Sequence, residues 1–351
     1  MTLKRRLNRT VGVVGTGSFG TAISNILAAN SDVLLYGRNA EGVDEIRKAR
    51  VSAGQQLNEQ VRLTSDIAEI ATTCSVIFPI VSSAGFREMM QGLGPLLHPY
   101  HILIHGTKGL DIQMTEKEIQ NRRKFDVEKI KTMSQVILDE SPVVRVGCLA
   151  GPNLARELAD KQPAATVVAS HFEEVIHEGQ RLLRNDRFRV YGNEDLRGIE
   201  LAGVLKNIIA IASGALSGLG LGENARALLV SRGMVEMIHL GKALGGEVHP
   251  FLGIAGIGDL VATCASNLSR NFTVGYRLAR GETLQQILST MEEVAEGVNT
   301  VHIMKFAADY LKVRAPITEA LYQVLFGKLS VERALEGLMR FPLHADIDFL
   351  D

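Results

Sequence analysis

The pattern of hydrophobic residues changes once along this chain, near residue 195. Before that point, short runs rich in valine, isoleucine and leucine alternate with amphipathic or charged segments. Several runs are apolar at every position, which is typical of strands covered on both faces and predicts a parallel sheet with helices on each side. The expected strands are VGVVG (11–15), DVLLYG (32–37), SVIFPIV (75–81), HILIHG (101–106), VVRVGCL (143–149), ATVVAS (165–170) and FRVYG (188–192).

After residue 195 the strand pattern gives way to helical periodicity. The expected helices are 196–213, 223–243, 259–267, 270–280, 298–312, 316–327 and 330–339. The turn residues in YGNEDLRG, 191–198, suggest the boundary, so we expect two domains, 1–194 and 195–351, the second all-α. The charge-dense stretch 115–131 is interpreted as a solvated helical excursion without chemistry of its own.

Composition restricts the class of partner. The chain has 351 residues, 46% hydrophobic and 22% charged, and a net charge of −1, so no global field would recruit nucleic acid or an anionic membrane. Three cysteines without a C-x-x-C pair fit a reducing compartment, and we expect a cytoplasmic protein. The apolar run LAGVLKNIIAIASG, 201–214, is broken by a lysine, an asparagine and glycines, so we expect no integral membrane association. A small-molecule substrate is the expected partner, and no metal site is expected.

A glycine turn follows the first expected strand. Gly15, Gly17 and Gly20 have G-x-G-x-x-G spacing, and the apolar-periodic segment SFGTAISNILAA continues as a helix. In this context the first glycine permits the tight turn, the second lets the backbone approach a pyrophosphate, and the third allows close packing of helix and strand. The N-terminus of the helix offers N–H groups to phosphates. The turn therefore predicts an α/β Rossmann-type domain that binds a dinucleotide.

The end of the second expected strand bears on cofactor choice. Arg38 stands where an NAD-specific protein usually has an acid that binds the ribose 2′-hydroxyl. An arginine can accept a 2′-phosphate, which favours NADP or dual use; it can also stack on the adenine or face water.

Lys206 lies within the apolar run 201–214. Its neighbours one helical turn away are Ala202, Gly203, Ile209 and Ala210, none of which can pair with an ammonium. One interpretation is a lysine whose stem lies along the core while its head reaches water. The other is a partly buried amine kept for acid–base chemistry.

Other polar residues each allow a structural and a functional interpretation. Lys108 follows the fourth expected strand, at the edge where open α/β sheets bind ligands, but could be an ordinary surface lysine. Asn153 and Asp259 both precede or begin helices and could serve as N-caps. The consecutive Ser269, Arg270 and Asn271 combine charged and neutral donors just before a helix, as a phosphate-binding clamp would.

Longer motifs resemble one family over nearly the whole chain. These are GTGSFGTA, TKGL, AGPNLARELA, ELAGVLKNIIAIASG, GLGLGENARALLVSRGMVEM, GIAGIGDLVATC, SRN and VAEGV, in this order. They resemble the bacterial type of NAD(P)-dependent glycerol-3-phosphate dehydrogenase. The resemblance implies reversible reduction of dihydroxyacetone phosphate to sn-glycerol 3-phosphate, which supplies glycerophospholipid synthesis. The segment 113–131 is longer than the family pattern, and PIVSSAGFRE replaces its usual V-P-[ST] turn.

The resemblance also implies roles for individual residues. Lys206 would be the proton donor and acceptor, Asp259 would hold the substrate hydroxyls and the Lys206 ammonium, and Lys108 would contact substrate and nicotinamide. The remaining implied substrate-binding residues are Gly151, Asn153, Ser269, Arg270 and Asn271. The implied cofactor-binding residues are Gly15, Gly17, Ser18, Phe19, Gly20, Arg38, Lys108, Ala155, Arg270, Val294 and Glu296.

Two other functions fit the same residues. A β-hydroxyacid dehydrogenase has a similar two-domain layout and also uses a lysine of its helical domain, but would need a carboxylate site. A non-catalytic dinucleotide-sensing protein is the second alternative, although no basic DNA-reading helix accompanies the glycine turn. The large apolar helical half also leads us to expect a symmetric homodimer.

Overall fold

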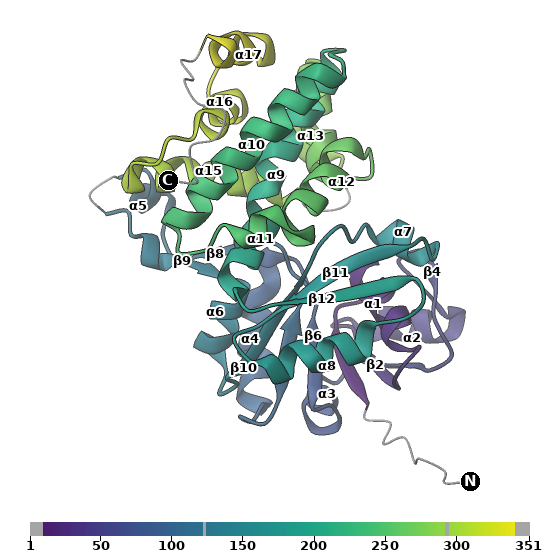
Figure 1. Ribbon diagram of the computed structural model, residues 1–351. Helices are drawn as coiled ribbons and strands as arrows, with labels where there is room; N and C mark the ends of the chain where they lie inside the picture. The colour runs from purple at the N-terminus through teal and green to yellow at the C-terminus, as the bar shows by residue number, and fades with distance from the viewer. Residues whose placement is uncertain (1–9, 122–123, 292–294, 341–351) are drawn as a thin grey trace. The chain divides into compact units, whose positions relative to one another are not determined.

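The computed structural model describes residues 10–121, 124–291 and 295–340, and it divides the chain into two compact units (Figure 1). The sheet unit comprises the chain up to Thr107 together with Met133–Leu196, and the helical unit comprises Lys108–Thr132 together with the chain from Arg197 onward.

An eight-stranded sheet forms the centre of the sheet unit, in the order β12-β11-β10-β7-β6-β1-β2-β5. The order reverses at β1, as in doubly wound folds, and β1 pairs in parallel with both β2 and β6. The strands are β1 (Val11–Val14), β2 (Val33–Tyr36), β5 (Val61–Thr64), β6 (Val76–Pro79), β7 (Ile102–His105), β10 (Arg145–Ala150), β11 (Ala164–Ala169) and β12 (Phe188–Asn193). The expected α/β Rossmann-type domain is confirmed.

The expectation of a wholly parallel sheet is wrong at one position. β11 runs antiparallel to β10, and β12 is parallel to β11. The short α7 (Ala155–Ala159) and the turn at Gly151 reverse the chain between β10 and β11, whereas a parallel connection requires a longer crossover. Strand β5 was also not expected: its exposed Arg62 interrupts the apolar run.

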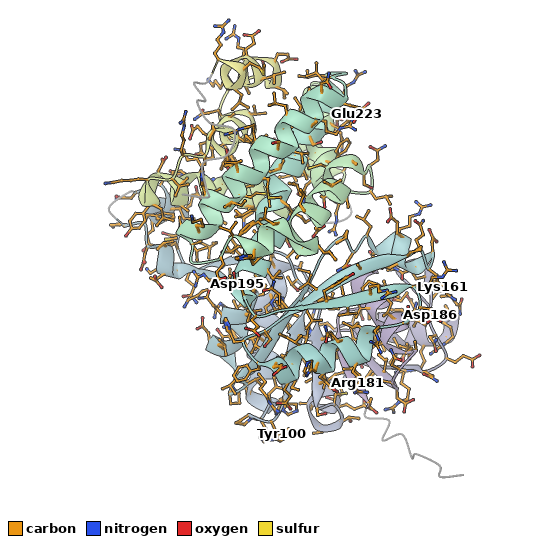
Figure 2. All side chains as sticks on the ribbon, in the orientation of Figure 1. Tyr100, Lys161, Arg181, Asp186, Asp195 and Glu223 are labelled. Carbon is orange, nitrogen blue, oxygen red and sulfur yellow. The ribbon has the colours of Figure 1, made fainter. Side chains whose placement is uncertain are left out.

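Helices cover both faces of the sheet, and alternate strand residues contribute to two cores. Val33 and Leu35 belong to one core and Leu34 to the other. The helices of this unit are α1 (Ser18–Leu27), α2 (Ala40–Ala49), α3 (Ile67–Thr73), α4 (Phe86–Leu93), α6 (Met133–Glu140), α7 and α8 (Glu173–Leu183). On α8 the apolar side chains are buried, while charged side chains such as Arg181 lie on its outer side (Figure 2). A two-stranded hairpin, β3 (Val51–Ser52) with β4 (Gln55–Gln56), follows α2.

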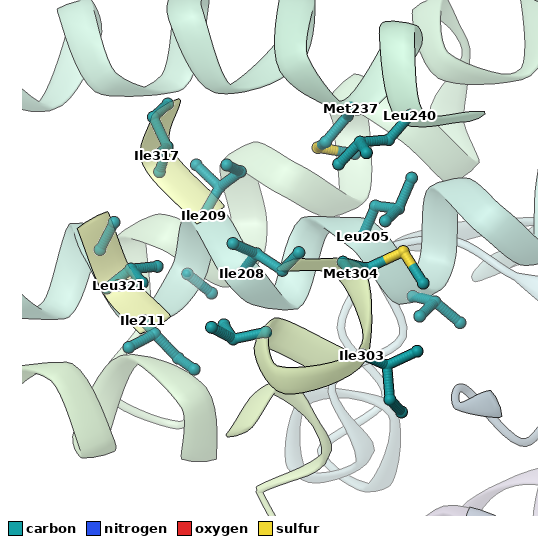
Figure 3. Close-up of a cluster of buried hydrophobic side chains, with 14 of the residues drawn as sticks. Leu205, Ile208, Ile209, Ile211, Met237, Leu240, Ile303, Met304, Ile317 and Leu321 are labelled. Carbon is teal, nitrogen blue, oxygen red and sulfur yellow. The ribbon is translucent and has the colours of Figure 1, made fainter. Parts of the chain in front are cut away.

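The helical unit is built around α9 (Leu196–Gly218), which is apolar on every side. Its side chains Leu205, Ile208 and Ile209 pack among Met237, Leu240, Met304 and Ile317 of neighbouring helices (Figure 3). The α-helices that follow α9 are α10 (Glu223–Ala243), α11 (His249–Leu252), α12 (Asp259–Ala265), α13 (Arg270–Ala279), α14 (Leu284–Ser289), α15 (Glu296–Leu311), α16 (Pro316–Leu325) and α17 (Val331–Met339). α9 is long and apolar enough to cross a membrane by composition, but its apolar window is entirely buried inside the protein.

The structure differs from the expected domain boundaries in the segment Lys108–Thr132, which belongs to the helical unit. The strands β8 (Leu110–Ile112) and β9 (Ile130–Thr132) pair as a hairpin, with the short α5 (Glu116–Ile119) between them. Leu110, Ile119, Phe125 and Ile130 are buried in the same core as α9. Residues 115–131 are therefore not merely a solvated helical excursion, because their apolar side chains complete this core.

Candidate active site

Lys206 is buried at the centre of a polar cluster in the helical unit. The residue is only 5% exposed, so its amine does not reach water. Its Nζ donates to Thr263 Oγ1 at 2.5 Å and lies 3.1 Å from Asp259 Oδ1. Of the two interpretations of Lys206, the structure therefore excludes the lysine whose head reaches water.

The carboxylate of Asp259 binds two lysines. Its Oδ1 faces Lys206, and its Oδ2 accepts a hydrogen bond from Lys108 Nζ at 2.6 Å. Asp259 is the first residue of α12, with Gly258 at the N-cap, so it is not the helix cap allowed by the sequence. Two ammonium groups around one carboxylate leave an excess positive charge, which favours an anionic ligand at this position.

Burial lowers the pKa of Lys206 from its usual 10.5 to about 8. Desolvation disfavours the charged amine and is the largest cause; the Asp259 carboxylate raises the pKa, and the Lys108 ammonium lowers it. The amine can therefore lose and regain a proton near neutral pH, which is the property required of a general acid–base group.

Thr263 joins this cluster and was not identified from the sequence. Its hydroxyl lies one helical turn after Asp259, 2.6 Å from the Asp259 carbonyl oxygen and 3.1 Å from its Oδ1, while it accepts from Lys206. The spacing of four residues in GDLVATC places both side chains on one face of a helix and could have indicated the pair. The hydroxyl holds the ammonium against the carboxylate.

The motif at 269–271 begins α13. Ser269 is the N-cap, and its Oγ accepts from the backbone N–H of Phe272. Asn271 is buried and accepts the Gly297 N–H at 2.9 Å, so it satisfies a donor at the start of α15. The Arg270 side chain is exposed to solvent. Ser269 and Asn271 thus have structural roles, and Arg270 contributes the exposed positive charge of this motif.

Close backbone contact fixes α13 against the helix that carries Lys206. A Cβ on Gly275 would lie 1.8 Å from the Ile211 carbonyl oxygen, so only glycine allows this approach. The start of α13 is thereby held in place relative to α9.

The geometry of the glycine turn in the sheet unit fits a dinucleotide. Gly15 has a φ of +124°, and a Cβ there would meet the Ile80 carbonyl oxygen at 2.1 Å. A Cβ on Gly20 would lie 2.0 Å from the Gly15 carbonyl oxygen, whereas the space beside Gly17 is open. Gly17 is the N-cap of α1 and gives it no side-chain cap, and Ser18 and Phe19 begin the helix, whose N-terminus is the end that favours anions.

The other expected positions in the sheet unit show mixed outcomes. Arg38 follows β2 with a side chain 86% exposed, and its guanidinium lies 3.9 Å from the carboxylate of Glu88, which is also exposed. Asn153 is not an N-cap: Leu154 precedes α7, and Asn153 Nδ2 instead donates to Thr166. Its buried Oδ1 has no hydrogen-bond partner among the residues that the structure describes, and Gly151 has a φ of +143°. Ala155 begins α7.

Of the remaining two expected cofactor positions, Glu296 is the first residue of α15. Val294 lies outside the described residues.

A cavity of about 390 Å³ in the helical unit is separate from this cluster. Its described lining is mainly aliphatic, from α9, α10, α16 and α17, and includes none of Lys108, Lys206 and Asp259. The polar cluster, not this cavity, has the chemistry of a catalytic site.

Comparisons with known proteins agree with the two-unit architecture. The family models described as NAD-dependent glycerol-3-phosphate dehydrogenase N-terminus and C-terminus match residues 10–176 and 195–336. The glycerol-3-phosphate dehydrogenase [NAD(P)+] of Teredinibacter turnerae is 38% identical over 96% of both chains. The Staphylococcus aureus enzyme of that name is 39% identical over 94% of this chain and 97% of its own.

A solved structure shows the same similarity. The crystal structure of glycerol-3-phosphate dehydrogenase from Coxiella burnetii is 30% identical, covers 95% of this chain and 99% of its own, and has a TM-score of 0.85.

Proposed function

Because the chain belongs to the NAD-dependent glycerol-3-phosphate dehydrogenase family, we propose that it interconverts dihydroxyacetone phosphate and sn-glycerol 3-phosphate with NAD(H) or NADP(H), and that Lys206 exchanges the proton. The observation that carries the proposal is the buried amine of Lys206, which has a pKa of about 8 and lies 3.1 Å from Asp259.

The proton transfer follows from the chemistry of a ketone. When bound, the reduced nicotinamide supplies a hydride for the ketone carbon of the substrate. Charge then develops on the carbonyl oxygen, and the Lys206 ammonium stabilises this charge and donates its proton there. In the opposite direction the neutral amine accepts the proton of the hydroxyl group.

Asp259 contacts the Lys206 amine directly, and Lys108 binds the other oxygen of the same carboxylate. Asp259 holds the ammonium in place and keeps the pKa of Lys206 from falling further, since its charge favours the protonated form. Lys108 occupies the second carboxylate oxygen and adds positive charge for the phosphate-bearing substrate. Asp259 would also bind the substrate hydroxyls, and Lys108 would also contact the nicotinamide.

The phosphate of the substrate is assigned to the start of α13. The Arg270 guanidinium is the charged donor there, and we assign it to the cofactor as well. Ser269 and Asn271 fix the local backbone through their caps and would add neutral donors. Gly151 and Asn153 complete the proposed substrate positions. The positive φ of Gly151 supports this assignment, as does Asn153 Oδ1, which is buried and has no partner within the described part of the chain.

The cofactor is assigned to the glycine turn of the sheet unit. Gly15, Gly17 and Gly20 allow the close approach, and Ser18 and Phe19 begin the helix that faces the phosphates. The exposed Arg38 favours NADP or dual use, because its side chain is available for a 2′-phosphate. Ala155, Val294 and Glu296 complete the assigned cofactor positions.

Three further assignments concern the cellular setting. We assign the protein to the cytoplasm, because Cys74, Cys148 and Cys264 are buried and form no disulfide with one another. Its product would supply glycerophospholipid synthesis. A homodimer is proposed because exposed apolar side chains, such as Leu228 and Met339, occur on the helical unit. Equilibrium sedimentation would test that state.

Family membership favours this function over the two alternatives. A β-hydroxyacid dehydrogenase would act on a carboxylate-bearing substrate, and a sensing protein would bind a dinucleotide without turnover. Initial rates with dihydroxyacetone phosphate, with a β-hydroxyacid, and with NADH or NADPH separate all three functions.

The deciding experiment pairs that assay with Lys206→Ala. We expect kcat to fall at least about 10²-fold, as for loss of a general acid–base group, with an unchanged circular dichroism spectrum. Lys305→Ala is the matched control, because that lysine forms ion pairs with Asp309 and Glu319 on the surface of the same unit. Near-normal turnover by Lys206→Ala would contradict the assignment of the proton to this amine.

A further inference from the structure

The β3–β4 hairpin lies against the glycine turn of the sheet unit. Its two turn residues, Ala53 and Gly54, both have positive φ, +46° and +74°, as the tight two-residue turn between β-strands requires. The pairing of Ser52 with Gln55 places both residues at the closed end of the hairpin.

Side chains of the hairpin bind backbone carbonyls of the glycine turn. The hydroxyl of Ser52, which is 1% exposed, donates to the Thr16 carbonyl oxygen at 3.0 Å and accepts from Thr21 Oγ1 at 3.0 Å. Gln55 Nε2 donates to the Ser18 carbonyl oxygen at 2.8 Å. The hairpin thus holds two alternate peptide groups of the turn.

Each held carbonyl also fixes the direction of the N–H group of the same peptide plane. In a planar trans peptide, the carbonyl and the following N–H point in opposite directions. When Ser52 holds the Thr16 carbonyl, the Gly17 N–H points away from the hairpin. Gln55 has the same effect on the Phe19 N–H through the Ser18 carbonyl. Both N–H groups belong to the start of α1, where a diphosphate is expected.

A second contact secures the hairpin to α1. Asn25, about two turns after Ser18 on the same helix, donates from Nδ2 to the Gln56 carbonyl oxygen at 2.9 Å and accepts the Asn58 N–H at 2.8 Å. The hairpin is therefore bound to α1 at two places, at its first residues and at Asn25. It can resist rotation of the peptide groups at the start of this helix.

We propose that the β3–β4 hairpin is a positioning element for the cofactor diphosphate, in which Ser52 and Gln55 orient the Gly17 and Phe19 N–H groups. The assignment rests on the cofactor site described above. Ser52 and Gln55 act through the backbone and are positioning residues. Their loss leaves the donors present but less firmly held, so the cofactor has to order them further on binding.

The test compares Ser52→Ala, Gln55→Met and the double variant with Gln56→Ala, whose side chain is exposed on the same hairpin. We expect the Kd for NADPH to rise about 3-fold to 10-fold for each single variant, and further for the double variant. Turnover at saturating cofactor and the KM for dihydroxyacetone phosphate should change less than about 2-fold. Gln56→Ala should bind as the wild type does.

Two probes distinguish orientation of donors from general destabilisation. ADP-ribose, which contains the diphosphate, should lose affinity in parallel with NADPH, whereas adenosine should not. In addition, Thr21→Ser should retain the hydroxyl contact and near-normal affinity, while Thr21→Val should resemble Ser52→Ala.

Unchanged NADPH affinity in both single variants would overturn the proposal, as would equal losses for adenosine and ADP-ribose. If the wild-type protein bound neither NADPH nor NADH, the proposed function itself would fail, and the hairpin would not be tested; if it bound NADH alone, the same comparison of variants would be made with NADH.

Discussion

At the scale of single residues, the protonation state of Lys206 should control the direction of catalysis. Its pKa is about 8, and reduction needs the ammonium while oxidation needs the neutral amine. We expect kcat/KM for dihydroxyacetone phosphate to fall as pH rises through about 8, and kcat/KM for glycerol 3-phosphate to fall as pH drops through the same region. Initial rates of reduction and of oxidation, measured between about pH 6.5 and pH 9.5, would show both changes.

The charge of Asp259 provides an internal check on that profile. The carboxylate raises the pKa of Lys206, so Asp259→Asn should move the descending limb of the reduction profile to lower pH, besides lowering the rate. Asp309→Asn, on an exposed residue of the same unit, should leave the limb in place. If the pH dependence of Asp259→Asn were the same as that of the wild type, a group other than Lys206 would cause the fall in rate.

Arg270 has a separable effect on substrate binding. Its guanidinium is exposed at the first position of α13, so Arg270→Ala should raise the KM for dihydroxyacetone phosphate about 10-fold or more, because a charged hydrogen bond is lost. The exposed Arg280 at the other end of the helix gives the matched control, Arg280→Ala. An equal loss of activity toward unphosphorylated dihydroxyacetone would argue against a phosphate contact.

The sequence indicated most of the polar cluster but not its internal contacts. Lys206, Lys108 and Asp259 were predicted from motifs, and the structure brings their charged groups together. The helical pattern around Lys206 offered it no partner, because its partners come from α12, more than fifty residues later. Asn153 was an ambiguous prediction, since a capping residue and a hydrogen bond to a neighbouring strand look alike in sequence.

At the scale of elements, continuous apolar runs predicted the central strands, and periodicity predicted the long helices. The sequence was less informative at the edges: β5 alternates with an exposed arginine, and the direction of β11 depends on how the chain turns after β10. Such turns obey local backbone geometry, which a hydrophobic pattern does not encode.

A buried carboxylate connects two helices of the helical unit. Glu236 on α10 accepts the N–H groups of Ile317 and Thr318 at 2.7 and 2.8 Å, and also the Thr318 hydroxyl. It thereby satisfies donors at the start of α16, where a negative charge is favoured. Burial outweighs these bonds and raises the pKa of Glu236 from 4.5 to about 7.

This shift predicts a pH-dependent stability. The pKa of Glu236 is higher in the folded state than in the unfolded state, so protonation of Glu236 stabilises the fold. This stabilisation is fully present below about pH 4.5 and is lost as pH rises through about 7. Relative to Glu236→Gln, the wild type should therefore gain on the order of 3 kcal/mol of unfolding free energy between pH 8 and pH 5. Urea denaturation of both proteins at each pH measures this difference. A constant difference across that range would mean that Glu236 does not titrate there.

At the scale of the whole molecule, the assignment of Lys108–Thr132 to the helical unit matters most for the proposed site. This segment leaves the sheet unit after β7, and it begins with the lysine that binds Asp259. The four buried apolar residues of this segment, three of them within the charge-dense stretch 115–131, are too widely spaced to form a recognisable helical or strand pattern. The structure shows that they fill the core beneath α9 and α15.

Phe125 provides the test of that assignment. The residue is 4% exposed, and its ring lies 5.4 Å from that of Tyr310 on α15. Phe125→Ala should lower the free energy of unfolding of the helical unit by about 3–5 kcal/mol, because a large cavity replaces the ring. Differential scanning calorimetry would show the change as a lower transition temperature.

The control for this substitution is Lys117→Ala, on an exposed position of the same segment, which should stay within about 0.5 kcal/mol of the wild type. Affinity for NADPH, measured well below the transition, should be unchanged in Phe125→Ala, because the glycine turn belongs to the sheet unit. If the segment were only a solvated excursion, Phe125→Ala would cost no more than Lys117→Ala. In that case the segment that carries Lys108 would not be anchored in the core, and Lys108 would not be held in position to bind Asp259.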